Sequence, residues 1–318
     1  MTKPAPVVTL ESMPSGIIQK RASGLLEALL DHGLLLGTGV PGIWGRAAAF
    51  ERVVDAVERL ISHETRDDAA SYVRFPPVIS RADFERSEFL KSFPHLAGVI
   101  HAFDGRPDEH QELLSSIESG GDWSNLVRMT DVVLTPAACY PVYPMLAGEL
   151  AAGGRLCDVS SYCFRYEPSL EPTRMVSFRM REQVRAGTPD EVLAFRERWM
   201  ARATKLFAEL AVPASSTTAS DPFFGRGGRL LALAQREQRL KFELVVPIIS
   251  DTDPTPVMSF NYHQDHFGRV FGIRTSDGAT AHTACVGFGL ERIVLALFKT
   301  HGFISDAWPK EVRSRLWP

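Results

Sequence analysis

The sequence lacks features that mark several classes of protein. Its four cysteines form no CxxC pair, and their number and spacing do not indicate a disulfide framework in a chain of this length. Lysine and arginine number 35 against 38 acidic residues, for a net charge of -3. A protein whose main partner is a long polyanion usually carries a basic excess. We therefore expect neither a disulfide scaffold nor a general nucleic-acid binder.

Long hydrophobic runs are also missing. The first residues lead into no continuous apolar segment, so we expect no signal peptide. The most apolar stretch, 24–42, is interrupted by Glu27, Asp31, His32 and several glycines, which makes it too polar for a membrane span. We expect a cytoplasmic protein without membrane contact. Residues 1–16 hold three prolines and little periodicity, and we expect a flexible arm there, before a single domain over 17–318.

Hydrophobic periodicity predicts an α+β protein with an antiparallel sheet. Apolar residues at helical spacing and their flanking residues predict helices over 44–63, 83–93, 143–153, 189–210, 229–241 and 290–299. Strand-like runs cover 72–79, 131–136, 159–167, 176–184, 242–249, 257–262, 270–274 and 281–287. Thr188 is expected to cap the fourth helix. Consecutive strands with short loops, and helices before and between them, favour the α+β class.

One cluster of charged and aromatic residues lies on the hairpin formed by 159–167 and 176–184. Side chains alternate along a strand, so Arg165 and Glu167 share a face, as do Phe178 and Glu182. Arg174 lies in the loop between the strands. An arginine fork suits a phosphate, and an aromatic ring can stack on a nucleobase. The pattern alone also fits a solvated strand face.

A second cluster ends the predicted strand 281–287. Gly287 and Gly289 allow the backbone to approach a ligand closely. Arg292 lies in the first turn of the apolar helix that follows, where the helix dipole does not favour a cation. A bound anion would compensate for that position, and a surface arginine is the alternative.

The order and separation of the two clusters resemble motifs 2 and 3 of class II aminoacyl-tRNA synthetases. The FRxE segment 164–167 with its loop and returning Phe178 matches motif 2, and the GxGxxR segment 287–292 matches motif 3. The segment around Pro76 and Pro77 is loosely similar to motif 1, a dimer element. The resemblance implies a class II synthetase-like antiparallel sheet flanked by helices, and a homodimer.

The resemblance also implies an ATP site, with Mg²⁺ bound alongside the nucleotide. Arg165 would bind the α-phosphate and the attacking carboxylate, and Glu167 would fix the adenine or the motif loop. Phe178 would stack on adenine and Arg174 would reach the terminal phosphates. Arg292 would cover the other face of the adenine and the γ-phosphate. Arg165 and Arg292 would be catalytic, because carboxylate attack on the α-phosphate builds negative charge that arginines offset.

Three further residues can form a metal site. Two thiolates and a carboxylate, with an open fourth position, suit a catalytic zinc, although isolated buried cysteines are the alternative. Cys139, Glu182 and Cys285 are similar in arrangement to the zinc ligands of the seryl-tRNA synthetases of methanogenic archaea, where the substrate amine completes the shell. This resemblance covers roughly residues 131–298 and implies one Zn²⁺ per chain. Cys157 and Cys163 match no motif and are expected in the core.

Barely forty residues precede the helix over 44–63, which leaves no room for the large tRNA-binding domain of a seryl-tRNA synthetase. The shortened, zinc-bearing pattern resembles the bacterial amino acid:[carrier protein] ligases. Those enzymes activate a small amino acid with ATP and transfer it to the phosphopantetheine thiol of a carrier protein. The resemblance implies glycine or alanine as substrate, a phosphopantetheinylated carrier as partner, and no tRNA.

In that family an added helix between motifs 2 and 3 docks the carrier, and the segment 221–241 occupies that place here. It is basic, which suits an acidic carrier, although an ordinary solvated helix is the alternative. Its candidate docking residues are Arg226, Arg229, Arg236 and Arg239.

Polar residues near the predicted strand 257–262 are candidates for the amino-acid pocket. We expect Asn261 and His263 to line it, Lys241 and Glu243 to face it, and Asp265 and His266 to lie in a loop. A hydrolase relay or a second metal at 263–266 is a less favoured alternative. Two other functions stay open: a seryl-type paralogue that charges tRNA with a partner, and a non-catalytic regulatory paralogue. Regulators of that kind often lose motif arginines, which are retained here.

Overall fold

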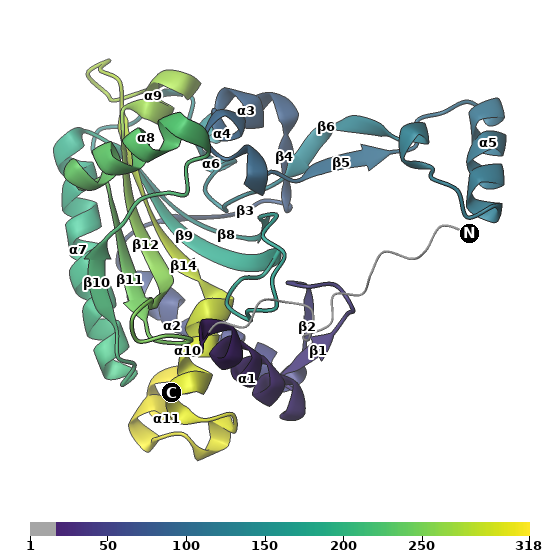
Figure 1. The fold of residues 1–318 in the computed structure, drawn as a ribbon. Coiled ribbons are helices and arrows are strands. Elements are labelled where there is room, and N and C mark those ends of the chain that lie inside the picture. Colours follow the sequence, from purple (N-terminus) through teal and green to yellow (C-terminus); the bar gives the residue numbers. More distant parts are fainter. Residues whose placement is uncertain (1–16) are drawn as a thin grey trace.

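A seven-stranded sheet forms the centre of the computed structural model, which describes residues 17–318; the arm predicted for 1–16 lies outside the described residues. The strand order is β10-β11-β12-β14-β9-β8-β3 (Figure 1). Their bounds are Ser71–Arg74 (β3), Arg155–Phe164 (β8), Ser177–Gly187 (β9), Ser215–Thr218 (β10), Lys241–Val246 (β11), Thr255–Gln264 (β12) and His282–Gly289 (β14). Only β3, at one edge, pairs in parallel with its neighbour. The predicted α+β class with an antiparallel sheet is confirmed.

Three helices pack on one face of this sheet: α2 (Ala48–Thr65), α7 (Pro189–Glu209) and α10 (Leu290–His301). Val286 and Phe288 of β14 point into the apolar core beneath them, and Trp199 of α7 meets Phe288 edge to face at 5.4 Å. The α7 helix begins with a capping box, since Thr188 and Glu191 each accept the other's backbone amide. The predicted cap at Thr188 is confirmed.

The helices α1 (Ile17–Asp31) and α11 (Lys310–Leu316) lie near the α10 end of the molecule (Figure 1). No helix within residues 17–318 is both long enough and apolar enough to cross a membrane.

The other face of the sheet carries smaller elements and a second core. Helices α6 (Val142–Met145) and α9 (His266–Phe271) pack there around Tyr143 and Phe267. Nearby are α3 (Arg81–Arg86), α4 (Phe89–Ser92), α8 (Gly225–Glu237) and a small sheet, β4-β6-β5, with bounds Val78–Ser80 (β4), Arg128–Leu134 (β6) and Val99–Ala102 (β5). The strands β5 and β6 and the helix α5 (Pro107–Glu118) project away from the body (Figure 1). Cys157 and Cys163 are buried in this second core, as predicted.

Several predicted elements were wrong at their boundaries. The strand expected over 72–79 is divided between the main and the small sheet, because Pro76 and Pro77 cannot donate to a ladder. Part of the helix predicted over 44–63 is a strand, β2 (Trp44–Arg46), which pairs with β1 (Leu35–Gly37). The prediction over 83–93 combined α3 and α4, which Glu88 separates with φ 63°.

Two predicted elements differ more strongly. The helix expected over 143–153 ends at Met145, and Gly148 instead begins the two-residue strand β7 (Gly148–Glu149), which pairs with β13 (Ile273–Arg274). Residues 270–271, predicted as strand, belong to α9, where helical spacing places Phe267 and Phe271 together in the core. The basic helix predicted over 229–241 runs from Gly225 to Glu237.

Candidate active site

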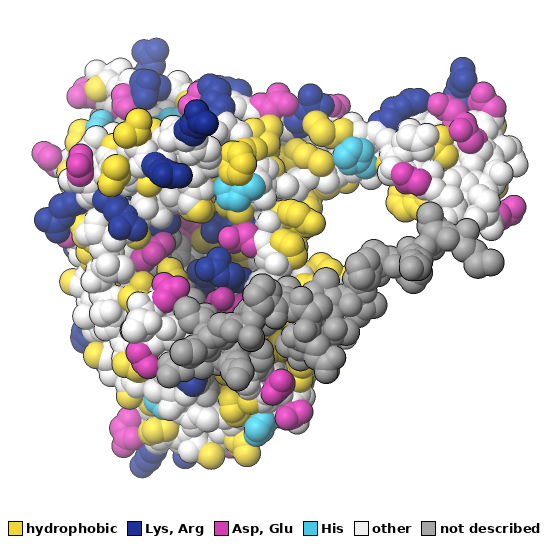
Figure 2. Space-filling view, viewed as in Figure 1, with side chains coloured by type: hydrophobic (Ala, Val, Ile, Leu, Met, Phe, Trp, Pro, Cys, Tyr) yellow, Lys and Arg dark blue, Asp and Glu magenta, His cyan; other side chains and the backbone are white. Residues whose placement is uncertain are grey.

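A cavity of about 640 Å³ opens between the main sheet, α4 and α8. Figure 2 shows basic and acidic side chains inside this hollow. Its lining includes every residue predicted for nucleotide, amino acid or metal: Cys139, Arg165, Glu167, Arg174, Phe178, Glu182, Asn261, His263, Cys285 and Arg292. The structure therefore brings together residues from both motif regions and from the segments between them.

Strand β9 supplies much of the cavity wall through alternation. Phe178, Met180 and Glu182 all line the cavity, as their shared strand face predicts. The intervening Arg179 and Arg181 point to the helical side. Arg179 binds the carboxylates of Glu51 and Glu291 at 2.6 and 2.8 Å, and Arg181 binds Asp158 at 2.5 Å. These ion pairs tie β9 to its neighbouring elements.

The arginines of the two motifs converge on the cavity. Arg165 lies just beyond the end of β8, where its Nε donates to the Pro136 carbonyl at 3.0 Å and its guanidinium lies 5.4 Å from the Phe178 ring centre. Arg174 pairs with Glu167 at 3.6 Å. Because β8 ends at Phe164, the strand predicted over 159–167 was too long at its C-terminal end. Arg165 and Phe178 nevertheless lie together, as predicted.

Arg292 lies in the first turn of α10, as predicted. Its Nε donates to the Thr173 carbonyl at 2.8 Å and its Nη1 to the Pro256 carbonyl at 3.0 Å. Burial lowers the pKa of Arg292, and the charges of Arg165 and Arg174 lower it further. Guanidinium groups that oppose one another's charge inside a cavity form a site that favours a polyanion.

Gly287 keeps the cavity floor open between these groups. A Cβ at this position would lie 3.1 Å from the Ser259 Oγ and 3.2 Å from the Met180 Cε. A side chain at this position would therefore have to displace the ends of the Ser259 and Met180 side chains, which also line the cavity.

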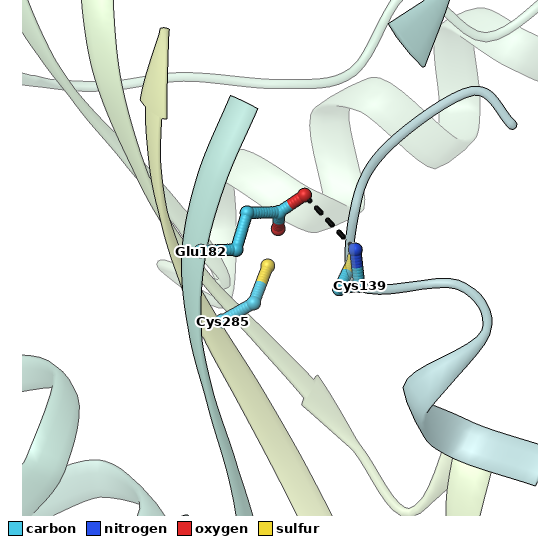
Figure 3. A group of neighbouring side chains, drawn as sticks. All are labelled: Cys139, Glu182 and Cys285. Carbon is cyan, nitrogen blue, oxygen red and sulfur yellow. Dashed lines mark hydrogen bonds between the residues drawn. The ribbon is translucent and has the colours of Figure 1, made fainter. Parts of the chain in front are cut away.

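Cys139, Glu182 and Cys285 form a buried cluster deep in the cavity (Figure 3). Their ligand atoms all lie within 4.8 Å of one another. Glu182 and Cys285 lie on the adjacent strands β9 and β14, and Cys139 lies between β6 and α6. The backbone amide of Cys139 donates to a carboxylate oxygen of Glu182 at 3.1 Å. This bond holds Cys139 next to Glu182 and Cys285.

The chemistry of this cluster fits zinc. Burial, reinforced by the charge of Cys285, raises the pKa of Glu182 to about 8. The hydrogen bond between the two thiols raises the pKa of Cys139 and lowers that of Cys285. Glu182 and Cys139 therefore resist ionisation beside Cys285, and a bound dication would reverse that resistance. Two sulfurs and one oxygen leave a fourth tetrahedral position open, the arrangement of a catalytic zinc.

Asn261 and His263 lie beside the metal cluster. Asn261 Nδ2 is 3.3 Å and His263 Nε2 is 3.7 Å from the Cys285 sulfur. Asn261 is the direct cross-strand partner of Cys285. Both side chains line the cavity, so their predicted place near the amino-acid pocket is consistent with the geometry, but each also faces a metal-ligand candidate.

A second polar cluster lines the cavity at the base of α8. The Lys241 ammonium pairs with Asp221 at 2.6 Å and with Glu243 at 3.1 Å, and Gln235 of α8 donates to Asp221 at 2.7 Å. Burial opposes the charge of Asp221, but Lys241 and Gln235 outweigh it and lower its pKa. Lys241 and Glu243 face the cavity, as expected from their alternation. The role of Asp221 as the partner of Lys241 was not predicted from the sequence.

Two other residues at or near the site were not recognised from the sequence. His266, expected in a loop, begins α9 and lines the cavity, where burial lowers its pKa. Tyr143 is fully buried beside Cys139. Its position four residues after Cys139 could have indicated this proximity, because the chain turns helically there.

The candidate docking arginines lie on the outer surface near α8, outside the cavity. Arg226, Arg229, Arg236 and Arg239 are all exposed. Arg239 lies beyond the helix with φ 52°, and its guanidinium is 5.2 Å from the Phe242 ring centre. Figure 2 shows basic side chains among hydrophobic ones over α8. The exposed hydrophobic side chains are Phe224, Leu230, Leu231 and Leu233.

Comparison with known proteins places this geometry in a family. The chain is 47% identical over 293 residues to amino acid--[acyl-carrier-protein] ligase 1 of Bradyrhizobium diazoefficiens, covering 92% of this chain and 89% of that protein. Ligase 2 of the same organism is also 47% identical, over 90% of this chain and 87% of its own. The type-2 serine--tRNA ligase of Methanopyrus kandleri is 29% identical, and the match spans 55% of it. No family model matches.

Solved structures show the same fold. The M. kandleri seryl-tRNA synthetase, crystallised with A. aeolicus tRNASec, aligns with a TM-score of 0.79 at 22% identity, over 92% of this chain and 60% of its own. The predicted class II synthetase fold is confirmed, with a mostly antiparallel sheet flanked by helices. From its identity to the two Bradyrhizobium proteins along nearly their whole length, the chain belongs to the amino acid--[acyl-carrier-protein] ligase family.

Proposed function

We propose that this enzyme activates glycine or alanine with ATP and transfers the aminoacyl group to the phosphopantetheine thiol of a carrier protein. One observation supports it above all others. Converging arginines and a buried Cys–Glu–Cys cluster line a single cavity, in a chain 47% identical to ligases that act on an amino acid and an acyl carrier protein.

In the first step a carboxylate oxygen of the amino acid attacks the α-phosphorus of ATP, and the bond to the β-phosphate oxygen breaks. The products are an aminoacyl-adenylate and pyrophosphate. No general base is needed, because the carboxylate is already ionised. Arg165 would hold the α-phosphate, while Arg174, Arg292 and Mg²⁺ would offset the charge on the leaving pyrophosphate. Phe178 and Glu167 would hold the adenine and the motif loop.

The amino acid is proposed to lie with its amine at the Cys139–Glu182–Cys285 cluster. Zinc held there would take the amine as its fourth ligand, which selects against substrates that lack an amine. Tyr143, His263 and Phe267 form a packed aromatic group next to the cluster, with the Tyr143 and Phe267 ring centres 3.8 Å apart. His263 and Phe267 line the cavity with Tyr143 packed behind them, and these rings beside the proposed amine site favour a small amino acid.

In the second step the carrier thiol attacks the carbonyl carbon of the adenylate and gives up its proton to water. The C–S bond of the thioester forms, the bond from the carbonyl carbon to the phosphate oxygen breaks, and AMP leaves. The carrier is proposed to dock on α8. Arg226, Arg229, Leu230, Leu233 and Arg236 recur at spacings of three and four residues and so share one helix face. Leu231 and Gln235, from the opposite face, line the cavity. An acidic carrier bound to the outer face would therefore be separated from the cavity by α8 alone.

We also propose a homodimer, on the resemblance to class II synthetases and their motif 1. Light scattering on the purified protein tests this directly, with a mass twice 35.2 kDa expected.

Amino-acid-dependent exchange of pyrophosphate into ATP tests the first step. We expect exchange with glycine or alanine for the zinc-loaded enzyme, and its loss in Cys285→Ala. Cys157→Ala is the matched control, because Cys157 is buried in the same core but lies outside the metal cluster. Absence of exchange with glycine, alanine and serine, in protein that holds one zinc, would contradict the proposal and favour a non-catalytic paralogue.

A further inference from the structure

The side chains around the two cysteines of the metal cluster present hydrogen-bond donors to the sulfurs. Asn261 Nδ2 lies 3.3 Å and His263 Nε2 lies 3.7 Å from the Cys285 Sγ. An amide nitrogen can only donate, so the Asn261 contact is an N–H···S hydrogen bond. Two side chains from one strand therefore converge on one sulfur.

The tautomer of His263 follows from its second contact. His263 Nδ1 lies 3.1 Å from the hydroxyl of Thr283, which is fully buried. A metal-bound thiolate only accepts hydrogen bonds, so Nε2 must carry the proton that faces Cys285. Nδ1 then accepts from the Thr283 hydroxyl. Thr283 fixes the ring so that its N–H points at the sulfur.

Tyr143 supplies the corresponding observation at the other cysteine. Its hydroxyl is buried and has no hydrogen-bond partner among residues 17–318, and Tyr143 lies four residues after Cys139 in the same buried cluster. A buried hydroxyl without a partner costs about 1–3 kcal/mol. A neutral thiol is a weak acceptor, whereas a metal-bound thiolate is a strong one. The unpartnered hydroxyl therefore fits a charged sulfur at Cys139.

We propose that Asn261, His263 and Tyr143 are positioning residues that donate hydrogen bonds to the two zinc thiolates. This inference rests on the zinc site of the proposed function and goes beyond it. Hydrogen bonds to the thiolates withdraw charge from sulfur, so the zinc remains acidic enough to take a neutral amine as its fourth ligand. The bonds also hold each sulfur in place against loss of the metal.

Replacing zinc with Co²⁺ makes these bonds visible, because sulfur-to-cobalt charge transfer gives an absorption band in the near ultraviolet. A hydrogen bond lowers the energy of the sulfur electrons, so its loss shifts this band to longer wavelength. We expect a red shift in Tyr143→Phe and in His263→Leu. We also expect zinc to leave to a chelator about 10–100-fold faster in each variant.

Matched variants separate the hydrogen bond from general damage. His263→Gln can keep a donor near the Nε2 position and should restore the band and slow zinc release relative to His263→Leu. Tyr140→Phe removes the same hydroxyl from a neighbouring, half-buried tyrosine and should leave both readouts unchanged. Asn261→Ala gives an independent third measurement if either Tyr143→Phe or His263→Leu prevents folding.

The outcomes are distinguishable. If wild-type protein binds one Co²⁺ with a thiolate band, and the band and the release rate are unchanged in Tyr143→Phe, His263→Leu and Asn261→Ala, the positioning role is wrong although the zinc site stands. If wild-type protein shows no thiolate band with Co²⁺, the zinc site itself is wrong, and this inference falls with that part of the proposed function.

Discussion

Arg165 illustrates how a single side chain is prepared for a phosphate. Its Nε is held by the Pro136 carbonyl and its guanidinium faces the Phe178 ring, so part of its entropy is lost before ATP binds. We predict that Arg165→Lys lowers kcat/KM for pyrophosphate exchange by about 10²–10³, because lysine keeps the charge but loses the planar fork. Arg198→Lys, at an exposed position on α7, is the control and should exchange at the wild-type rate. Equal rates for the two variants would remove Arg165 from the site.

Glu182 gives a prediction in pH. In metal-free protein its pKa is raised from 4.5 to about 8, so between these values the folded state keeps a proton that the unfolded state has released. The free energy of unfolding should therefore fall as pH rises from about 5 to 8. Urea denaturation of metal-free wild type and of Glu182→Gln measures this, and the variant should show a smaller slope. With zinc bound, the free energy of unfolding should instead rise with pH, because zinc binds the ionised carboxylate. Identical slopes in the two metal-free proteins would contradict the raised pKa.

At the scale of elements, substitutions on the outer face of α8 should weaken carrier docking without changing adenylation. Arg229 and Arg236 lie on its outer face and Gln235 anchors the inner face to Asp221. Reversing both outer charges, Arg229→Glu with Arg236→Glu, should raise KM for the carrier about tenfold. Pyrophosphate exchange should not change, because these side chains lie outside the cavity. Arg198→Glu with Lys205→Glu, at two exposed positions on α7, is the matched double charge reversal. A similar KM effect from α7 would show that net charge alone acts.

The sequence predicted elements well where one physical rule dominated. Alternation along β9 placed Phe178 and Glu182 on one face, and the Thr188 cap marked the start of α7. It failed where tertiary contacts decided the conformation. Residues 270–271 contain Val270 and Phe271, which suit a strand, but the need to bury Phe267 and Phe271 together gives a helical turn in α9. The helix α5 was missed because none of its residues is buried.

The candidate site was predictable to the extent that motifs mark it. The arginines and the metal cluster were found by resemblance, and all of them line the cavity. Tyr143 and Asp221 were missed because their roles depend on contacts across the fold, with Cys139 and Lys241 respectively. The four-residue spacing from Cys139 was the one available signal for Tyr143, whereas Asp221 lies 20 residues before Lys241 and has no such signal.

At the scale of the whole molecule, the main sheet supports both the apolar core and the active site, one on each face. Helices α2, α7 and α10 bury one face in a large apolar core, which leaves the opposite face of the same strands to carry charged and metal-binding groups. Strands β9 and β14 contribute side chains to both faces, so the cavity floor lies directly on the apolar core. The one helix that borders both the cavity and the outer surface at the proposed docking site is α8, within the part of the chain that the structure describes.

Transfer of radiolabelled glycine or alanine to a carrier thiol tests the central claim most directly. The acceptors are acyl carrier proteins with and without phosphopantetheine, free pantetheine, and total tRNA. The account predicts label on the phosphopantetheine-bearing carriers, released by hydroxylamine as a thioester, slow labelling of pantetheine, and none on tRNA or on carriers without the prosthetic group. Label on tRNA, with neither carrier nor pantetheine acylated by enzyme that forms the adenylate, would contradict it.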